Sequence, residues 1–289
     1  MKQIAITECP RDAMQGIIPF IPTEKKIHFL NLLLRVGFDR LDFGSFVSPK
    51  AIPQLRDTAE VLAGLDPDAG RETDLLAIIA NARGALEAAS HERIRFLGFP
   101  FSVSETFQLR NTNSTREQSL DRVKEIVEIC AANNKIPLVY LSMGFGNPYG
   151  DEWNEHIVAE YTEKLCGMGV RHLALADTVG DSTPEKIKQL YPFLSGEFED
   201  VEWGIHLHST PQESQGKIRA ALEAGCHRFD TALRGFGGCP MAEDELVGNI
   251  ATENLLTALS SGEFSSLQPD LNMEAWATAM EYSWEVFNP

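Results

Sequence analysis

The sequence lacks the features of several common protein classes. It has no apolar run near the length that crosses a bilayer, no Pro/Gly/Ser-rich linker and no low-complexity stretch. Residues 1–8 lead almost directly into a strand-like run, without the apolar segment of a signal peptide or an Arg/Ser-rich transit pattern. We therefore expect a cytoplasmic protein without a membrane partner.

Cysteine is scarce, and basic residues are outnumbered by acidic ones. The five cysteines have no Cys-x-x-Cys spacing, which argues against a disulfide framework or a thiolate zinc site. Lys and Arg number 25 against 42 Asp and Glu, for a net charge of −17, which disfavours nucleic acid as a partner because a polyanion would be repelled. A local cleft that holds a divalent cation and an arginine can still attract a small anionic substrate.

A chain of 289 residues suits two small domains or a single α/β barrel, and nothing in it marks a domain boundary. Apolar or alternating runs predict eight strands, separated by helical patterns, as parallel strands with crossover helices require. The main rival is an open doubly wound sheet, but residues 8–12 replace the glycine-rich phosphate turn expected there. We predict a single (β/α)8 TIM barrel over about residues 3–262, with a helical extension over about 263–289.

The predicted elements have clear residue ranges. Strands are expected at 3–7, 40–43, 74–79, 94–98, 136–142, 172–176, 202–208 and 227–232. Helices are expected at 23–36, 119–133, 154–168, 183–190 and 212–224, and an extra one at 272–287. Thr183 before Pro184 predicts a helix start, and glycines 37, 169 and 225 fall where helices should stop.

Two histidines one residue apart, His206 and His208, are the strongest chemical signal. Side chains in a strand alternate between faces, so both imidazoles share one face while Ile205 and Leu207 share the other. Such a pair can give a divalent cation two nitrogen ligands. Alternatively, one or both could form ordinary hydrogen bonds at a strand end.

Other polar residues follow the predicted strands. In a barrel of this kind the chemistry occurs at the carboxyl ends of the strands, so these residues are expected to converge. They are Arg11, Asp12, Asp42, Asp177, Arg234, the segment 235–240 and Asn249.

With these residues the sequence resembles the hydroxymethylglutaryl-CoA lyase family, within the metal-dependent barrel lyases and condensing enzymes that include isopropylmalate and homocitrate synthases. The likeness covers most of the chain. Its segments are 10–15, 45–50 with 53–54, 104–107 with Asn111 and Asn113, 176–180, the His206/His208 pair, 235–240 and 248–253. The SFVSPK and GGCP segments are the ones most particular to the lyase branch.

The resemblance implies a divalent cation, Mg²⁺ or Mn²⁺, held by Asp12, His206, His208 and Asn249. It implies that Arg11 holds the substrate carbonyl oxygen that becomes enolate-like, and that Cys239 lies on a glycine-flanked loop that closes over the site. Gln15, Asp42 and Asp177 are then supporting polar groups, Asp42 among the catalytic residues and Gln15 and Asp177 on the substrate. Arg234, a departure from the family pattern, adds a cation beside the loop and is also expected to bind the substrate.

Several of these residues also have simpler interpretations. Arg11 and Asp12 could form a surface ion pair in a turn, and Cys239 could fill a glycine turn as a small apolar residue. Asn249 and Asp177 could each cap a helix or orient a loop.

The sequence departs from the family pattern at three places. Asp42 stands where these lyases carry glutamate, which draws the carboxylate back by about 1.5 Å. The segment from Cys239 to Asn249 is one residue longer than expected, with an acidic run at 241–245. Residues 209–211 (STP) follow the second histidine where Asp or Asn is usual.

We therefore predict a metal-dependent carbon-carbon lyase that cleaves 3-hydroxy-3-methylglutaryl-CoA, or a similar 3-hydroxyacyl-CoA, to acetyl-CoA and a keto acid such as acetoacetate. Two alternatives stay open. One is an acyl-CoA/2-oxo acid condensing transferase or pyruvate-type aldolase, and the other is a catalytically inactive metabolite-binding barrel. Homo-oligomers are the default expectation for such enzymes.

Overall fold

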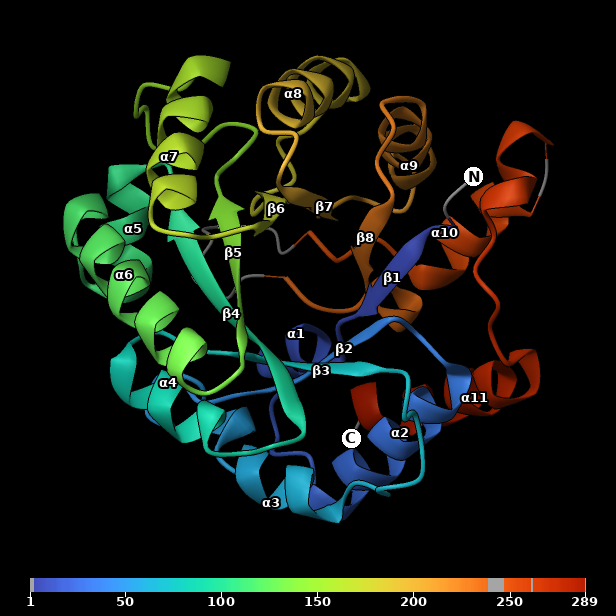
Figure 1. The fold of residues 1–289 in the computed structure, drawn as a ribbon. Helices are drawn as coiled ribbons and strands as arrows, with labels where there is room; N and C mark the ends of the chain where they lie inside the picture. The colour runs from blue at the N-terminus through green and yellow to red at the C-terminus, as the bar shows by residue number, and fades with distance from the viewer. Residues whose placement is uncertain (1–2, 239–246, 261, 289) are drawn as a thin grey trace.

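Eight parallel strands close into a barrel that is surrounded by helices (Figure 1). The computed structural model describes residues 3–238, 247–260 and 262–288. Each strand pairs with the next one along the chain, and β8 pairs with β1. The strands are β1 (Ala5–Glu8), β2 (Arg40–Ser45), β3 (Asp74–Ile78), β4 (Ile94–Ser102), β5 (Ile136–Ser142), β6 (His172–Asp177), β7 (Glu202–Leu207) and β8 (Arg228–Thr231). The predicted (β/α)8 barrel is confirmed.

Helices follow the strands in the order that a barrel of crossover connections requires. They are α1 (Pro10–Gln15), α2 (Thr23–Val36), α3 (Thr58–Gly64), α4 (Ala82–Ala89), α5 (Glu105–Thr112), α6 (Arg116–Ala132), α7 (Glu155–Gly167), α8 (Pro184–Glu197), α9 (Ser214–Glu223), α10 (Thr252–Leu259) and α11 (Met273–Phe287). Short 3-10 turns occur at Pro53–Leu55, Leu233–Gly235 and Gly262–Leu267. No helix among the described residues is long and apolar enough to span a membrane.

Local sequence signals explain where several helices begin and end. The Thr183 side chain accepts a hydrogen bond from the Lys186 N–H, and Pro184 opens α8 as predicted. Gly37 ends α2 with φ of 86°, in the left-handed region that glycine adopts without a steric penalty. The helix predicted at 183–190 continues to Glu197, because Pro192 is tolerated inside it.

Two apolar layers hold the barrel together. Inward-facing residues of the consecutive strands β3 to β6, among them Leu76, Phe96, Leu138 and Ala174, fill the interior as one cluster. A larger cluster packs the outward faces of the strands against the helices. The barrel is therefore a packed core, and a cavity can open only at its end.

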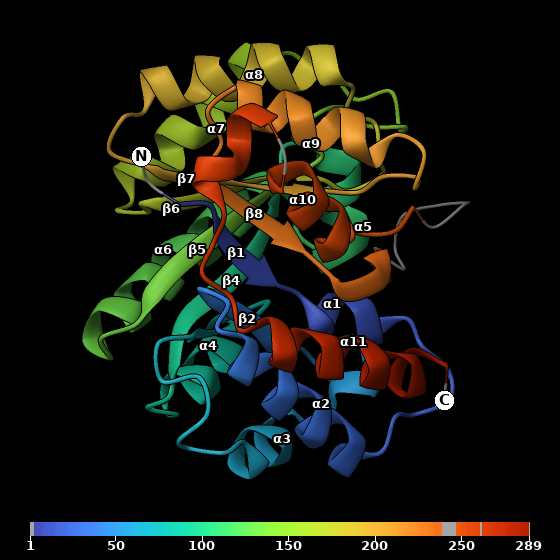
Figure 2. The same cartoon turned by 90° about the vertical axis from the view of Figure 1, so that its right-hand side faces the viewer.

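The helix α11 lies across α2 on the outside of the barrel (Figure 2). The rings of Tyr282 and Phe287 pack against Phe29, with centroids 6.5 and 5.6 Å apart, and Trp276 packs against Phe38. The backbone N–H of Asn272 also donates to the carbonyl of Val36 at 2.9 Å. The predicted extra helix thus covers the flank of the barrel beside its second helix.

Candidate active site

The short helix α1 brings three polar side chains to the carboxyl end of β1. Pro10 opens this helix, where its missing N–H costs no hydrogen bond. Residues three and four apart share a helix face, so Gln15 reaches both charged residues. Its amide donates to Asp12 Oδ1 at 2.8 Å, and its carbonyl oxygen accepts from Arg11 Nη1 at 3.1 Å. Arg11 and Asp12 are both buried, so they form no surface ion pair.

Asp12 lies beside His206, which is on β7, and His208, which directly follows the end of that strand. One potential ligand atom from each of Asp12, His206 and His208 lies within 4.8 Å of the other two, and all three residues are buried. Burial alone would raise the pKa of Asp12, but Arg11 and the two imidazoles lower it to about 2. The carboxylate is therefore ionised at neutral pH, as a metal ligand must be.

Asn249 is the fourth member of this group and contacts Asp12 directly. Its amide nitrogen donates to Asp12 Oδ2 at 2.7 Å and to the carbonyl of Phe236 at 2.8 Å. Both nitrogen hydrogens are thus satisfied, while the buried Asn249 Oδ1 has no hydrogen-bond partner among the described residues. Gly237 is required here, because a Cβ at this position would collide with the Asn249 amide. We call Asp12, His206, His208 and Asn249 the upper cluster.

The two histidines are oriented by different acceptors. His208 Nδ1 lies 3.0 Å from the carbonyl of Thr178, so this nitrogen carries the proton and the unpartnered Nε2 keeps its lone pair. His206 Nδ1 lies 3.4 Å from Asp230 Oδ2 on the neighbouring strand β8. Burial lowers the pKa of His206, but Asp230 and Asp12 outweigh it and the net pKa is raised. Burial and the charge of His206 lower the pKa of His208.

Unpartnered buried atoms are rare in proteins, because each loses its hydrogen bonds to water on folding. The upper cluster has three such atoms: His206 Nδ1, which lies beside Asp230, and His208 Nε2 and Asn249 Oδ1, which accompany the ionised Asp12 carboxylate. A mixed set of oxygen and imidazole donors suits a hard-to-borderline divalent cation. The residues present therefore fit a metal ion.

Asp42 holds the Arg11 guanidinium. Arg11 Nε donates to Asp42 at 3.0 Å and Nη2 donates to the same carboxylate, while Nη1 is shared between Asp12 and Gln15. Four of the five guanidinium N–H groups are thus occupied, which leaves one on Nη2 for a substrate. Burial raises the pKa of Asp42 to about 6, and Arg11 opposes this rise. A bulge in β2 between Asp42 and Gly44 changes the strand register here.

A cavity of about 220 Å³ opens over these groups at the carboxyl ends of the strands. Its polar side includes Arg11, Asp12, Gln15, His206 and His208. Its other walls are mostly apolar or weakly polar, formed by Val47, Ala51, Ile52, Ile78, Ala80, Pro100, Phe107, Asn111, Thr112, Tyr140, Ser142, Ala176 and Thr178. Such a cavity suits a ligand with one charged or chelating end and an apolar remainder.

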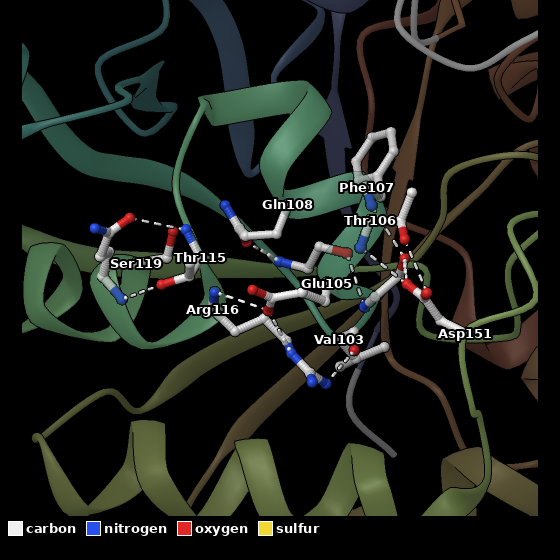
Figure 3. A network of polar contacts seen from close by, with 12 residues as sticks. Val103, Glu105, Thr106, Phe107, Gln108, Thr115, Arg116, Ser119 and Asp151 are labelled. Atoms are coloured by element: carbon white, nitrogen blue, oxygen red, sulfur yellow. Dashed lines mark hydrogen bonds and ion pairs between the residues drawn. The ribbon is translucent and has the colours of Figure 1, made fainter.

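A polar network fixes α5, which supplies one wall of the cavity (Figure 3). Asp151 accepts from the Ser104 hydroxyl at 2.6 Å and from the backbone N–H and hydroxyl of Thr106 at 2.9 and 2.8 Å. On the other side, Arg116 donates to Glu105 at 2.9 Å and to the carbonyl of Val103 at 2.9 Å. The start of α5 is thereby tied to the loop that carries Asp151 and to the first residue of α6.

Asp177 acts on the loop rather than in the cavity. Its carboxylate accepts from the Ser182 backbone at 3.1 Å and from the Ser182 hydroxyl, and it lies 3.2 Å from Lys217 Nζ. The buried Lys217 also donates to the carbonyls of Gly180 and His208 at 3.0 and 2.9 Å. These contacts fix the Thr178 carbonyl that orients His208, so the simpler interpretation of Asp177 as a loop-orienting residue agrees with its position.

The structure places Arg234 away from the cavity, contrary to the predicted substrate-binding role. Its guanidinium donates to the Ser283 hydroxyl at 2.8 Å and to the Met280 carbonyl at 2.7 Å, both in α11. It also lies 5.2 Å from the Trp284 ring centroid. The proximity of Arg234 to the loop in sequence was misleading, because its side chain points to the C-terminal helix. Cys239 and the acidic run at 241–245 lie outside the described residues.

Sequence reasoning missed three residues of the site. Asp230 and Tyr140 lie inside the barrel, and the Tyr140 ring packs against His206 with centroids 5.7 Å apart. Tyr140 interrupts an apolar strand, but Asp230 lies in a strand of mixed polarity, so the sequence offered little signal for it. Lys217 is 2% exposed in a predicted helix, where a lysine normally faces solvent, so no sequence pattern marked it.

Comparison with known proteins agrees with this geometry. The family model described as HMGL-like matches residues 3–281. The chain belongs to the HMGL-like family. It is 32% identical to hydroxymethylglutaryl-CoA lyase YngG of Bacillus subtilis, over 97% of this chain and 92% of that protein. It is 33% identical to the mitochondrial hydroxymethylglutaryl-CoA lyase of Bos taurus, over 90% and 79% of the two chains.

Solved structures of HMGL-like proteins superpose closely on the whole chain. An HMG-CoA lyase from Acinetobacter baumannii, in complex with coenzyme A and 3-methylmalate, has a TM-score of 0.89 at 31% identity, over 99% of this chain and 92% of that one. An HMG-CoA lyase from Brucella melitensis has a TM-score of 0.90 at 27% identity, with full coverage of both chains.

Proposed function

We propose that this protein is a metal-dependent carbon-carbon lyase that cleaves 3-hydroxy-3-methylglutaryl-CoA to acetyl-CoA and acetoacetate. The observation that carries the proposal is the position of the upper cluster. It lies next to the Arg11–Asp42 pair at one end of a largely apolar cavity. Membership of the HMGL-like family and the lyase names of relatives over most of the chain support the same activity.

The upper cluster would hold a divalent cation, which we propose to be Mg²⁺ or Mn²⁺ because its ligands are oxygen and imidazole. A bound cation of this kind would supply a Lewis acid that makes the substrate hydroxyl more acidic. The chain supplies the orientation, since Thr178 and Asp230 each fix one imidazole.

Cleavage breaks the bond between C2 and C3 of the substrate. The C3 hydroxyl loses its proton and becomes the ketone of acetoacetate, while the bond's electron pair moves onto the thioester carbonyl as an enolate. The remaining N–H of Arg11 is available to donate to that oxygen, and a proton then returns to C2 to give acetyl-CoA. One preorganised donor to such an oxyanion is typically worth about 3 kcal/mol, or about a hundredfold in rate.

The remaining predicted roles follow from this scheme. Gln15 holds Arg11 and Asp12 in position relative to each other through its two hydrogen bonds. The apolar wall of the cavity accommodates the methyl group and the thioester arm of the substrate. We retain Cys239 as the residue that approaches the site from its glycine-flanked segment. We also retain a cytoplasmic location and a homo-oligomer, which cell fractionation and light scattering would test.

The decisive experiment measures acetyl-CoA release from a panel of 3-hydroxyacyl thioesters with Mg²⁺ or Mn²⁺. We expect cleavage of the 3-hydroxy-3-methylglutaryl thioester, and its loss on chelation or in His206→Ala. Activity that survives both treatments would exclude the metal-dependent mechanism. Release of free CoA from acetyl-CoA and a 2-oxo acid would instead indicate a condensing transferase, and metal-dependent ligand binding without any product would indicate an inactive barrel.

A further inference from the structure

A second group of donor atoms shares one residue with the upper cluster. Its members are Cys9 at the end of β1, His206 on β7 and Asp230 on β8, three strands that are neighbours in the closed barrel. One potential ligand atom from each lies within 4.8 Å of the other two, and all three residues are buried. We call this group the lower cluster.

The lower cluster has unmet bonding capacity. Asp230 is 2% exposed, yet among the described residues its carboxylate and His206 Nδ1 make no well-formed hydrogen bond, and the contact between them is a long one of 3.4 Å. Arg228 Nη1 lies 3.8 Å from Asp230 Oδ1, which is beyond hydrogen-bond distance. Cys9 is fully buried, and its sulfur makes only a 3.5 Å contact with the carbonyl of Thr7.

We propose that the lower cluster binds a thiophilic divalent cation of the Zn²⁺ type through Cys9 Sγ, His206 Nδ1 and an Asp230 oxygen. Sulfur, imidazole and carboxylate are the ligands that Zn²⁺ takes in proteins, and the sulfur discriminates against Mg²⁺. A thiolate and a carboxylate also neutralise the two charges of the ion. Binding releases the thiol proton of Cys9 to solvent.

The distances nearly match those of a tetrahedral ion. Bonds of about 2.0–2.3 Å place neighbouring ligand atoms about 3.5 Å apart. His206 Nδ1 and Asp230 Oδ2 already lie 3.4 Å apart. The distances from Cys9 Sγ to the other two ligand atoms are at most 4.8 Å. They need to shorten by at most about 1 Å, which a small rotation of the Cys9 side chain provides.

Occupation of the two clusters is mutually exclusive. A neutral imidazole has one lone pair, so a cation on His206 Nδ1 leaves the ring proton on Nε2 and removes this ligand from the upper cluster. Zn²⁺ therefore inhibits the enzyme by shifting the tautomer of His206. The predicted inhibition rests on the proposed function, because it requires His206 to be a ligand of the catalytic cation. Binding of Zn²⁺ at the lower cluster does not depend on that function.

A spectroscopic test uses Co²⁺, which forms a visible thiolate charge-transfer band when it replaces Zn²⁺ on sulfur. Added to the metal-free full chain, Co²⁺ should give this band, and Zn²⁺ but not Mg²⁺ should remove it. Cys9→Ser should abolish the band, with Cys9→Ala as a second variant if the serine protein unfolds. Cys130→Ser, a buried cysteine outside any ligand group, and Cys239→Ser should both retain it. A band that persists without Cys9, or no band in the natural protein, overturns the proposal.

A second measurement concerns inhibition. With Mn²⁺ present, the Zn²⁺ concentration for half-inhibition should rise at least about tenfold in Cys9→Ser, since loss of even an outer-shell partner of a metal ligand costs about 10–100-fold in affinity. Equal inhibition of both proteins contradicts the tautomer mechanism. A protein without lyase activity that still shows the Cys9-dependent band would refute the proposed function and leave the lower cluster standing.

Discussion

Asp42→Asn tests whether the guanidinium of Arg11 acts through its fixed position. The change conserves the shape of the side chain but removes its negative charge. In the natural protein the Asp42 carboxylate accepts hydrogen bonds from Arg11 Nε, at 3.0 Å, and from Arg11 Nη2. The asparagine oxygen can accept one of these two bonds, and its amide would face an N–H donor in place of the other. Loss of one partner from a buried pair typically costs about 3–5 kcal/mol of folding stability.

The expected effect on catalysis follows from geometry. Asp42 is fully buried and does not line the cavity, so it cannot act on the substrate directly. Arg11 would retain its contacts with Asp12 and Gln15 but could shift by about 1 Å, and a misplacement of that size costs about a hundredfold in rate. We expect kcat for thioester cleavage to fall by about that factor, with little change in KM.

A matched control separates this effect from general destabilisation. Asp57→Asn removes one partner of another buried pair, in which Lys26 Nζ lies 2.8 Å from Asp57 Oδ1 and neither residue lines the cavity. It should lower the free energy of unfolding comparably and leave kcat unchanged. Asp42→Glu retains the charge and should restore part of the lost kcat. A kcat in Asp42→Asn within threefold of that of the natural protein, or an equal loss in the control, refutes the reasoning.

Three further predictions concern other parts of the site. Asp230→Asn should weaken Mn²⁺ binding about 10–100-fold in calorimetry, because the His206 ring loses its charged acceptor; an unchanged affinity would contradict this role. Burial raises the pKa of Glu8 to about 8, so the stability that the neutral carboxyl contributes is fully present below pH 4.5 and is lost as pH rises to 8. Unfolding free energy should fall by up to about 1.4 kcal/mol per pH unit in this window, and Glu8→Gln should lack this slope; parallel pH profiles would disprove the assignment. Arg234→Ala should cost about 1–3 kcal/mol in denaturant unfolding by detaching α11 but leave KM unchanged, and a raised KM at full stability would restore its predicted substrate role.

The sequence predicted the barrel well because strand and helix periods are local properties. The range 23–36 coincides with α2, and the predicted strands differ from the observed ones by a few residues at their ends. The helices α1, α3, α4, α5 and α10 were missed, because six to eight residues are too few to show a helical period.

The candidate site was predicted only in part. Motifs indicated Arg11, Asp12 and the histidine pair, which the structure brings together. The direction of a side chain depends on tertiary packing, which explains the error at Arg234 and the omission of Asp230. Asp42 was expected as a supporting polar group, but only the structure shows that it holds Arg11.

The backbone on either side of residues 239–246 is pinned to the barrel. His208 bridges Asn249, the Ser209 N–H donates to Gly248, and the Ile250 N–H donates to Leu207, while Gly235 and Gly237 pack closely against Asn249. Asn249 is therefore held by contacts with residues that lie outside this stretch. Changes of sequence within residues 239–246 should therefore leave the residues proposed to hold the ion in place, so this part of the chain can vary in evolution without loss of those residues.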